Sequence, residues 1–310
     1  MSTSRSAPKH QLHGWMNLDK PYDMGSTEAV SAIKRLLCPT KIGHAGTLDP
    51  LATGILPLAL GEATKTSAYM MDAIKEYYFT ICFGEQRDTD DAEGNVIATS
   101  LHRPTDTDLK NIIPNYIGVI QQTPPIYSAL KINGQRAYDL ARAGQKVTVK
   151  PREVCIYNIA MIERTDDHHA SFTVTCGKGT YVRSLARDIS VACNTVGHVS
   201  ELRRTRVGAF TENNAISLDD VKKYATLHSP DKYQALLQPI ECGLDDIPAV
   251  SLDHAQAAQL RHGQGIMVAE HMFSDISEAS EVYQAKCGNQ LIALVRRNAR
   301  HIAPLRVFNL

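Results

Sequence analysis

The chain has 310 residues, of which 43% are hydrophobic and 21% charged, as expected for a water-soluble globular protein of about two domains. Its 33 basic and 33 acidic side chains give a formal net charge of zero. This excludes a histone-like polycation but not a local basic surface for nucleic acid. The longest apolar stretch, residues 54–61, is far shorter than the ~20 residues that a membrane helix needs. The polar N-terminus lacks the apolar core of a secretion signal.

The residues that bind metals or cofactors in other proteins show no supporting spacing here. Seven cysteines are scattered without a close pair, which favours buried, reduced thiols in a cytoplasmic protein over a zinc site. The acidic run at 88–94 lacks the glycine and glutamate spacing of a calcium-binding loop, so we interpret it as a polar turn. No phosphate-binding glycine loop is present. The sequence therefore predicts no metal and no cofactor.

In chain order, the residues before 249 combine strand-like and helix-like periodicities. Residues 1–12 are predicted to be a disordered arm, and Ser26 is the expected N-cap of the first helix. A segment rich in glycine and proline, 43–61, interrupts the pattern. The remaining elements are strands at 14–18, 77–83 and 171–176 and helices at 26–37, 62–75, 107–118 and from Thr180 onward. A sheet with segregated helices indicates an α+β catalytic domain, which we place at residues 13–248.

A second unit is predicted at residues 249–310. Asp253 is the expected N-cap of a short helix that Gly263 ends. Three strand-like runs follow, at 282–287, 290–295 and 305–308. This pattern is typical of a small, β-rich module.

The segment 123–152 is basic in an otherwise neutral chain. Between residues 124 and 152 there are six basic residues and one acidic residue, with Tyr127 and Tyr138 among them. A solvated surface would explain this composition. RNA binding explains it better, because phosphates require Lys or Arg and unstacked bases require aromatic platforms. We therefore predict an RNA-gripping insertion.

The densest group of residues that could carry chemistry lies at 43–54. There, a glycine-rich turn presents the carboxylate of Asp49. Asp followed by Pro is equally typical of a helix start, with Asp49 as the N-cap. Arg183 lies one turn into a predicted helix and could bind a carboxylate, although spacing alone also fits a surface arginine. Arg203 and Arg204 are ambiguous in the same way between a solvated face and an RNA contact.

Several motifs in order resemble the TruB family of tRNA pseudouridine synthases. The longest is KIGHAGTLDPLATGILPLALGEATK at 41–65, which is similar to that family's catalytic segment. The others are NLDKP at 17–21, KEY at 75–77, YSALK at 127–131, KGTYVR at 178–183 and LRR at 202–204. The resemblance covers residues 14–210, and residues 249–310 resemble the PUA-like domain of bacterial members more loosely. It implies a pseudouridine synthase fold: a mixed, largely antiparallel sheet flanked by helices, with a basic thumb insertion and a PUA-like domain.

The resemblance also implies a reaction and its residues. Family members turn one uridine of the tRNA T loop, position 55, into pseudouridine without a cofactor, after flipping the base out of its stack. By this pattern Asp49 is the nucleophile, Arg183 its charge partner, and Tyr77 the residue that stacks on the base and transfers a proton. The expected substrate contacts are His44, Tyr77, Tyr181, Leu202 and Lys20, the last beside Asp19. The expected RNA backbone contacts are Lys131, Arg136, Arg142, Arg203 and Arg204. The expected partner is the T arm of tRNA, with no membrane and no obligate protein partner, and the default oligomeric state is a monomer.

Two other classes of function remain open at this point. One is a non-catalytic RNA-binding or tRNA-folding module on the same scaffold, although such a module would not require Asp49. The other is a hydrolase that pairs Asp49 with a carboxylate of the run at 88–94. The resemblance leaves the route of the aspartate open as well, because attack on the sugar, attack on the base and glycal formation all use the same carboxylate.

Overall fold

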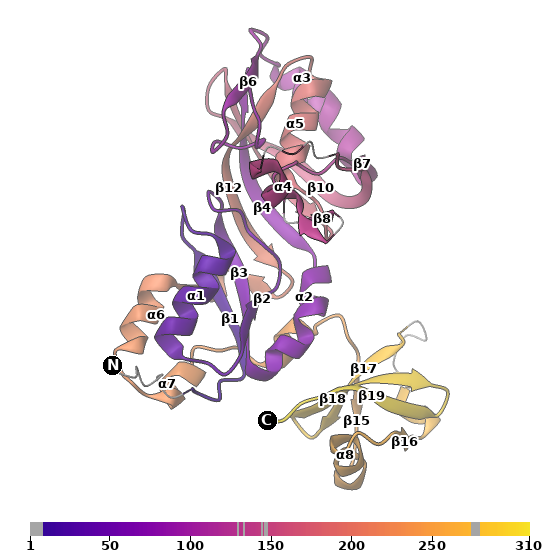
Figure 1. Cartoon of the computed structure of the whole chain (residues 1–310). Helices are drawn as coiled ribbons and strands as arrows, with labels where there is room; N and C mark the ends of the chain where they lie inside the picture. Colours follow the sequence, from indigo (N-terminus) through magenta and orange to yellow (C-terminus); the bar gives the residue numbers. More distant parts are fainter. Residues whose placement is uncertain (1–8, 129, 133, 144, 146–147, 274–279) are drawn as a thin grey trace.

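A ten-stranded mixed sheet runs through two lobes of the molecule, and a five-stranded sheet forms a third lobe (Figure 1). The computed structural model describes residues 9–128, 130–132, 134–143, 145, 148–273 and 280–310. The large sheet has the order β14-β1-β3-β12-β4-β11-β10-β7, with β2 on β3 and β13 on β12. Its strands are β1 (Gly14–Lys20), β2 (Ile42–His44), β3 (Thr53–Leu60), β4 (Lys75–Phe83), β7 (Gly118–Gln122), β10 (Arg152–Arg164), β11 (His169–Cys176), β12 (Gly197–Val207), β13 (Phe210–Thr211) and β14 (Ile216–Ser217).

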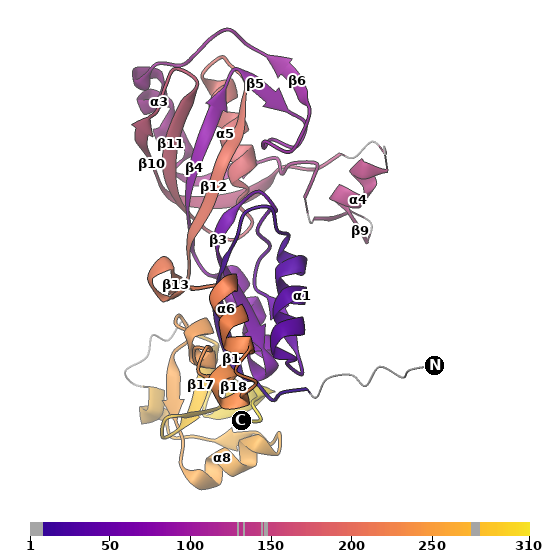
Figure 2. The same cartoon turned by 90° about the vertical axis from the view of Figure 1, so that its left-hand side faces the viewer.

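The expected fold class is confirmed by this topology. Only β1–β14 and β3–β12 are parallel; the other neighbours within the large sheet are antiparallel. Helices α1 and α6 lie along the lower part of the sheet, whereas α3 and α5 lie along the upper part (Figure 2). The helices of this domain are α1 (Ser26–Leu37), α2 (Ser67–Asp72), α3 (Asp106–Ile112), α4 (Ala137–Arg142), α5 (Val182–Ala192), α6 (Leu218–Ala225) and α7 (Pro230–Gln234). Short 3₁₀ turns occur at Gly61–Thr66, Ile113–Tyr116, Glu212–Asn214 and Ile240–Gly243.

The two halves of the large sheet meet where β3 pairs with β12. Only two residue pairs join them, Arg203 with Thr53 and Arg204 with Gly54. Gly54 has a φ of +100°, and a Cβ there would lie 2.2 Å from the carbonyl oxygen of Arg204. Glycine is therefore required at this join, because any side chain would push the two half-sheets apart.

The C-terminal module is a five-stranded sheet of order β15-β17-β18-β19-β16 with one helix against it. Asp253 caps α8 (His254–Arg261) as expected, through a reciprocal capping box with Gln256. The module packs against the catalytic domain, since Leu294 and Phe308 share an apolar cluster with Trp15. Its strands are β15 (Ala249–Ser251), β16 (Ile266–Met267), β17 (Val282–Cys287), β18 (Gln290–Asn298) and β19 (His301–Val307), and a 3₁₀ turn spans Glu270–Phe273.

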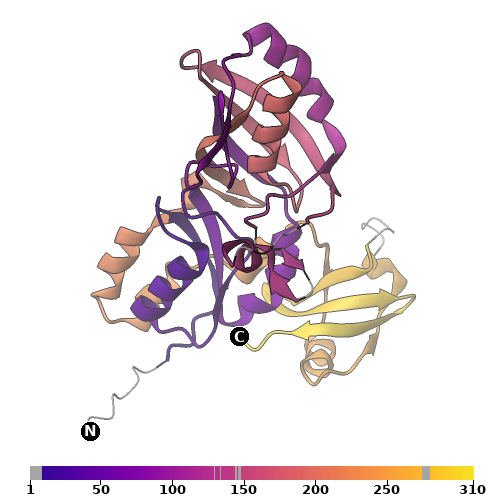
Figure 3. The same cartoon turned by 45° about the horizontal axis from the view of Figure 1, so that its top comes forward.

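Two small hairpins project from the catalytic domain. The first, β5 (Glu85–Arg87) with β6 (Val96–Thr99), flanks the acidic run. The second, β8 (Lys131–Ile132) with β9 (Gln135–Arg136), precedes α4 in the basic segment. Figure 2 shows α4 and β9 standing off to one side of the sheet, and Figure 3 shows this segment, hereafter the thumb, in front of the junction between the lobes.

Several sequence predictions are wrong in detail. The first helix begins after Gly25, so Ser26 is not its N-cap, and Tyr181 rather than Thr180 precedes α5. Residues 53–60 form a strand that the sequence pattern did not reveal. Both faces of this strand are buried, so its sequence is apolar throughout and shows no alternation. Residues 62–75 are divided between a 3₁₀ turn, α2 and the first residue of β4.

The ends of the chain and the cysteines also require correction. Residues 1–8 of the predicted arm lie outside the described residues, but residues 9–12 belong to the fold. The His10 N–H donates to the Cys38 carbonyl, and Leu12 is buried in the main core. Of the seven cysteines, only Cys176 and Cys193 are buried, and the other five are partly exposed.

Candidate active site

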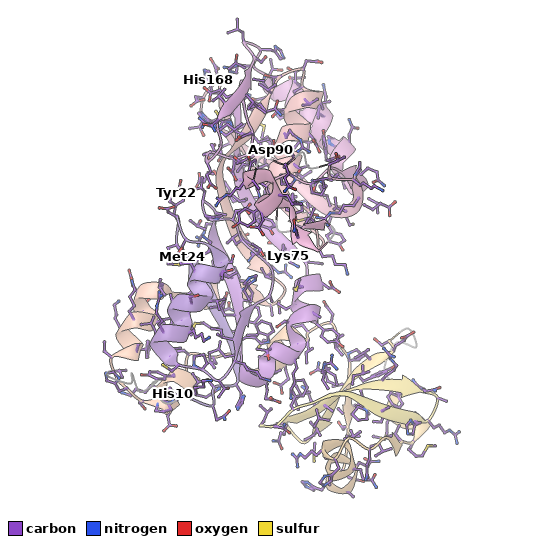
Figure 4. The ribbon with its side chains drawn as sticks, viewed as in Figure 1. His10, Tyr22, Met24, Lys75, Asp90 and His168 are labelled. Carbon is purple, nitrogen blue, oxygen red and sulfur yellow. The ribbon has the colours of Figure 1, made fainter. Side chains whose placement is uncertain are left out.

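A cleft of about 510 Å³ lies where the two halves of the large sheet meet. Residues 46–49, from the loop between β2 and β3, line it together with residues 177–183, from the loop into α5. The end of α2 and the start of β4 contribute as well, and Figure 4 shows Lys75 at this junction. Asp49, Tyr77, Tyr181, Arg183 and Leu202 all line this one cleft, although they are far apart in the sequence.

Asp49 sits in a turn, not at a helix start. Its carbonyl accepts from the Ala52 N–H at 3.1 Å, and β3 begins at Thr53. The interpretation of Asp49 as a helix cap is therefore wrong. The residues on either side of Asp49 are fixed by hydrogen bonds. The buried Ser26 hydroxyl donates to the Leu48 carbonyl and accepts from the Leu48 N–H, and Lys20 Nζ donates to the Pro50 carbonyl at 3.1 Å.

Lys20 is a buried support for this turn. Its ammonium also donates to the carbonyls of Pro21 and Met24, at 2.8 and 2.7 Å. Burial lowers the pKa of Lys20 to about 8, although the nearby Asp49 carboxylate opposes the shift. Lys20 is buried and does not line the cleft, so it is placed to support the pocket, as expected of its pairing with Asp19, rather than to touch the substrate.

Arg183 is a buried partner of Asp49. Its Nη2 donates to Asp49 Oδ1 at 3.1 Å, and its Nε lies 2.9 Å from Oδ2. The Arg183 side chain is 5% exposed and that of Asp49 31%, so the arginine is covered while the carboxylate reaches the cleft. Burial by itself would lower the pKa of the guanidinium. The carboxylates of Asp49 and Asp91 outweigh it and raise the pKa above its ordinary value, so Arg183 stays charged.

The acidic run provides the second half of this ion-pair network. Asp91 Oδ2 lies 3.4 Å from Arg183 Nη1, and the buried Asp90 accepts from Arg187 at 2.8 Å. Arg183 thus lies between Asp49 and Asp91 and forms an ion pair with each. This arrangement does not favour the hydrolase alternative, in which the two carboxylates would act as a pair. The turn predicted here is confirmed, and the described residues contain no group of three acidic, His or Cys ligands arranged for a metal ion. Sequence reasoning missed the role of Asp91.

The root of the thumb is bonded to the same helix. Arg183 Nη2 donates to the Tyr127 carbonyl at 3.0 Å, and both Ser184 and Arg187 donate to the Thr123 carbonyl at 2.8 Å. One residue of α5 therefore contacts both the Asp49 carboxylate and the base of the thumb.

Arg203 and Arg204 are bonded within the protein, which argues against their expected role as RNA backbone contacts. Arg204 is 1% exposed and donates to the carbonyls of Gly46 and Thr47, in the loop that carries Asp49, and of Ile55 in β3, so it holds this loop from the protein interior. Arg203 is bound on two sides by the Asp19 and Glu212 carboxylates. Both guanidinium groups are already engaged by protein oxygens, which leaves them poorly placed to bind RNA phosphates.

The remaining predicted residues divide between the cleft and its surroundings. The Tyr181 ring lies 5.2 Å from the Arg152 guanidinium, in cation–π range, and its main chain is held by Gln122. His44 ends β2 and is not among the residues that line the cleft. Lys75, to which we gave no role, is a buried cation in the cleft wall, and burial lowers its pKa to about 8.

The thumb is only partly described. The side chains of Lys131 and Arg136 lie outside the described residues, although their main chains pair in the hairpin. Arg142 is 64% exposed, with its guanidinium 4.9 Å from the Tyr138 ring and 3.6 Å from Glu93. A cation stacked on an aromatic ring at an exposed tip is typical of an RNA-binding surface.

Family models match most of the main domain. The model described as the TruB family pseudouridylate synthase N-terminal domain matches residues 34–182, and that of the tRNA pseudouridylate synthase B C-terminal domain matches 183–245. A curated relative from Bradyrhizobium diazoefficiens, tRNA pseudouridine synthase B, is 48% identical over 97% of this chain and 87% of its own. Its counterpart from Rhodospirillum rubrum is 45% identical over 99% of this chain and 100% of its own.

Solved structures agree on the fold. The Cbf5 chain in the archaeal box H/ACA sRNP Nop10–Cbf5 complex matches with a TM-score of 0.72 at 24% identity, over 97% of this chain and 87% of that one. A Cbf5–Nop10–Gar1 complex gives 0.71 at 26%, over 98% and 90%. The architecture is that of a pseudouridine synthase. Because the family models and the curated relatives agree with this architecture, the chain belongs to the TruB family of tRNA pseudouridine synthases. These enzymes are isomerases that form pseudouridine in tRNA. No helix in the described part of the chain is long and apolar enough to cross a membrane.

Proposed function

We propose that the protein isomerises uridine 55 in the T loop of tRNA, with Asp49 as the nucleophile. The observation that carries this proposal is the Asp49–Arg183 pair in the cleft, in which a half-covered carboxylate meets a buried, permanently charged guanidinium. A nucleophilic carboxylate must be ionised, and Arg183 keeps that state favourable after RNA has displaced water. Sugar attack, base attack and glycal formation all use this anion.

Tyr77 is suited to donate a proton rather than to accept one. Burial raises the pKa of its phenol, an effect that the Arg204 guanidinium opposes only in part, so the hydroxyl stays protonated near neutral pH. Tyr77 would therefore stack on the flipped uracil and donate a hydrogen bond or proton. Tyr181 and Leu202 would bound the same pocket.

Uptake of the uridine requires that it leave the folded T loop, because its reacting atoms are buried in the base stack. His44, at the end of β2, would fill the vacated space, and Lys131, Arg136 and Arg142 of the thumb would bind the RNA backbone. The expectation of a cytoplasmic monomer without a protein partner stays a prediction. The solved neighbours are complexes with Nop10 or with Nop10 and Gar1, and size-exclusion chromatography with light scattering tests the point.

The test combines product mapping with one substitution. Purified protein is incubated with unmodified tRNA, and pseudouridine is mapped; a single site in the T loop is expected, and several sites or none would contradict the proposal. Asp49→Asn keeps the size of the side chain but cannot attack, so turnover should vanish while folding and tRNA affinity persist. Pseudouridine formation by a contamination-free Asp49→Asn variant would remove Asp49 from the mechanism.

A further inference from the structure

A second ion pair joins the two walls of the cleft at its mouth. Lys178 Nζ lies 3.0 Å from Asp72 Oδ1, and both residues line the cleft. Asp72 is the last residue of α2, which precedes β4, and Lys178 lies in the turn between β11 and α5. Asp49 and Arg183 join the same two walls, but they are more covered.

The two ion pairs differ in exposure, and therefore in how easily an anion from solution can displace the carboxylate of each pair. The side chains of Lys178 and Asp72 are 68% and 60% exposed, whereas Arg183 is 5% exposed. An exposed pair of this kind adds little to stability, so a competing anion can displace the carboxylate at small cost. The lysine ammonium is a compact point charge that binds a phosphate without a fixed geometry.

We propose that Lys178 binds a backbone phosphate of the RNA and that Asp72 occupies this lysine until the RNA enters. The proposal rests on the assignment of this cleft as the RNA-binding active site. Asp72 is then a competitor of the RNA: it lowers the affinity of every strand that brings a phosphate to Lys178, because the Lys178–Asp72 contact must break first. When a phosphate does reach Lys178, the cross-cleft contact breaks and the cleft mouth is free to take the strand.

The test is a double-mutant cycle on tRNA affinity. The variants Lys178→Gln, Asp72→Asn and their combination are compared through the Kd of tRNA that the enzyme has already modified, at 50 and 200 mM salt. Lys178→Gln should weaken binding, and one lost phosphate contact should reduce the fall in affinity between the two salt concentrations about threefold. Asp72→Asn should tighten binding by up to about fivefold at 50 mM salt, the strength of an exposed pair.

The combination decides the proposal. If Asp72 acts by occupying Lys178, Asp72→Asn has no effect once Lys178 is Gln. An equal tightening in both backgrounds would overturn the proposal, because Asp72 would then act only as a general negative charge. Unchanged affinity and salt dependence in Lys178→Gln would overturn it too.

A matched control is available on α6. Lys222 and Asp219 form an exposed pair at 2.7 Å, neither lines the cleft, and Lys222→Gln and Asp219→Asn change the net charge by the same amounts. These variants should leave the Kd unchanged, and effects as large as those at the cleft would contradict a local role for Lys178. Failure of the proposed T-loop reaction would appear separately, in the pseudouridine map and in Asp49→Asn.

Discussion

The Ser26 hydroxyl donates to the carbonyl of Leu48 at 2.7 Å and accepts from the N–H of the same residue at 2.8 Å. Both partners are buried, and Leu48 directly precedes Asp49. A residue at the start of α1 therefore fixes the main chain that carries the carboxylate. The helix end does not need this hydroxyl, because α1 begins without a side-chain cap.

Ser26→Ala should lower both stability and turnover. It leaves the Leu48 N–H and carbonyl buried without partners, which costs about 1–3 kcal/mol. The freed turn should then move Asp49 relative to Arg183 and reduce kcat. Urea denaturation and single-turnover rates measure the two effects. Ser31→Ala is the control, since Ser31 bonds only the Thr27 carbonyl on the same helix. Equal kcat values for the two variants would contradict the positioning role.

The lowered pKa of Lys20 should make the contribution of this residue to the free energy of unfolding rise with pH above neutrality. Its pKa is about 8 in the folded protein and 10.5 when unperturbed. Between these values the unfolded chain holds a proton that the folded chain has lost, so the free energy of unfolding increases with pH by up to about 1.4 kcal/mol per unit. The contribution of Lys20 is the difference between the parent protein and Lys20→Met, measured by urea denaturation at pH 8, 9 and 10. A difference that stays flat or shrinks would contradict the buried, partly deprotonated lysine.

The thumb should bind RNA mainly through charge. Changing Lys131, Arg136 and Arg142 together to Glu should weaken tRNA binding and flatten its dependence on salt, because the electrostatic contribution scales with the number of phosphate contacts. Filter binding over a salt series gives both quantities. The control variant reverses Lys110, Lys222 and Lys223, exposed lysines of α3 and α6. If the two triple variants behave alike, net charge and not the thumb explains the effect.

The C-terminal module should contribute binding rather than chemistry, because every cleft residue precedes it. Deletion of residues 249–310 should raise KM for whole tRNA more than it lowers kcat. The deletion would also expose Trp15, which packs in the apolar cluster shared with Leu294 and Phe308, so a milder change is preferable. Phe308→Ala is a milder change: Phe308 is 3% exposed in the shared cluster, and its truncation costs up to about 3–5 kcal/mol.

Phe308→Ala should accordingly raise KM for whole tRNA while kcat stays within about twofold. An isolated T-arm hairpin serves as the control substrate, since it should not reach the module. Steady-state kinetics on both RNAs make the comparison. An equal rise in KM on the hairpin would show that the module acts on the active site itself.

Local pattern predicted much of the fold because local rules govern those elements. Alternation at 77–83 predicted β4, and the Asp253 cap predicted α8. The same rules failed at 53–60, because a strand buried on both sides has no polar face to reveal its period.

The sequence by itself determined the fold class, the family resemblance and five residues of the candidate cleft, Asp49, Tyr77, Tyr181, Arg183 and Leu202, since these depend on residue types in a fixed order. It could not decide between exposed and buried roles for single charges. Arg204 was predicted to be an RNA contact, yet its guanidinium donates to the carbonyls of Thr47 and Gly46 in the loop that carries Asp49. Asp91 looked like one carboxylate of a polar turn, yet it faces Arg183. Only the tertiary structure decided these roles, because whether a charge meets solvent or a partner depends on chain segments as distant as Gly46 is from Arg204, 158 residues away.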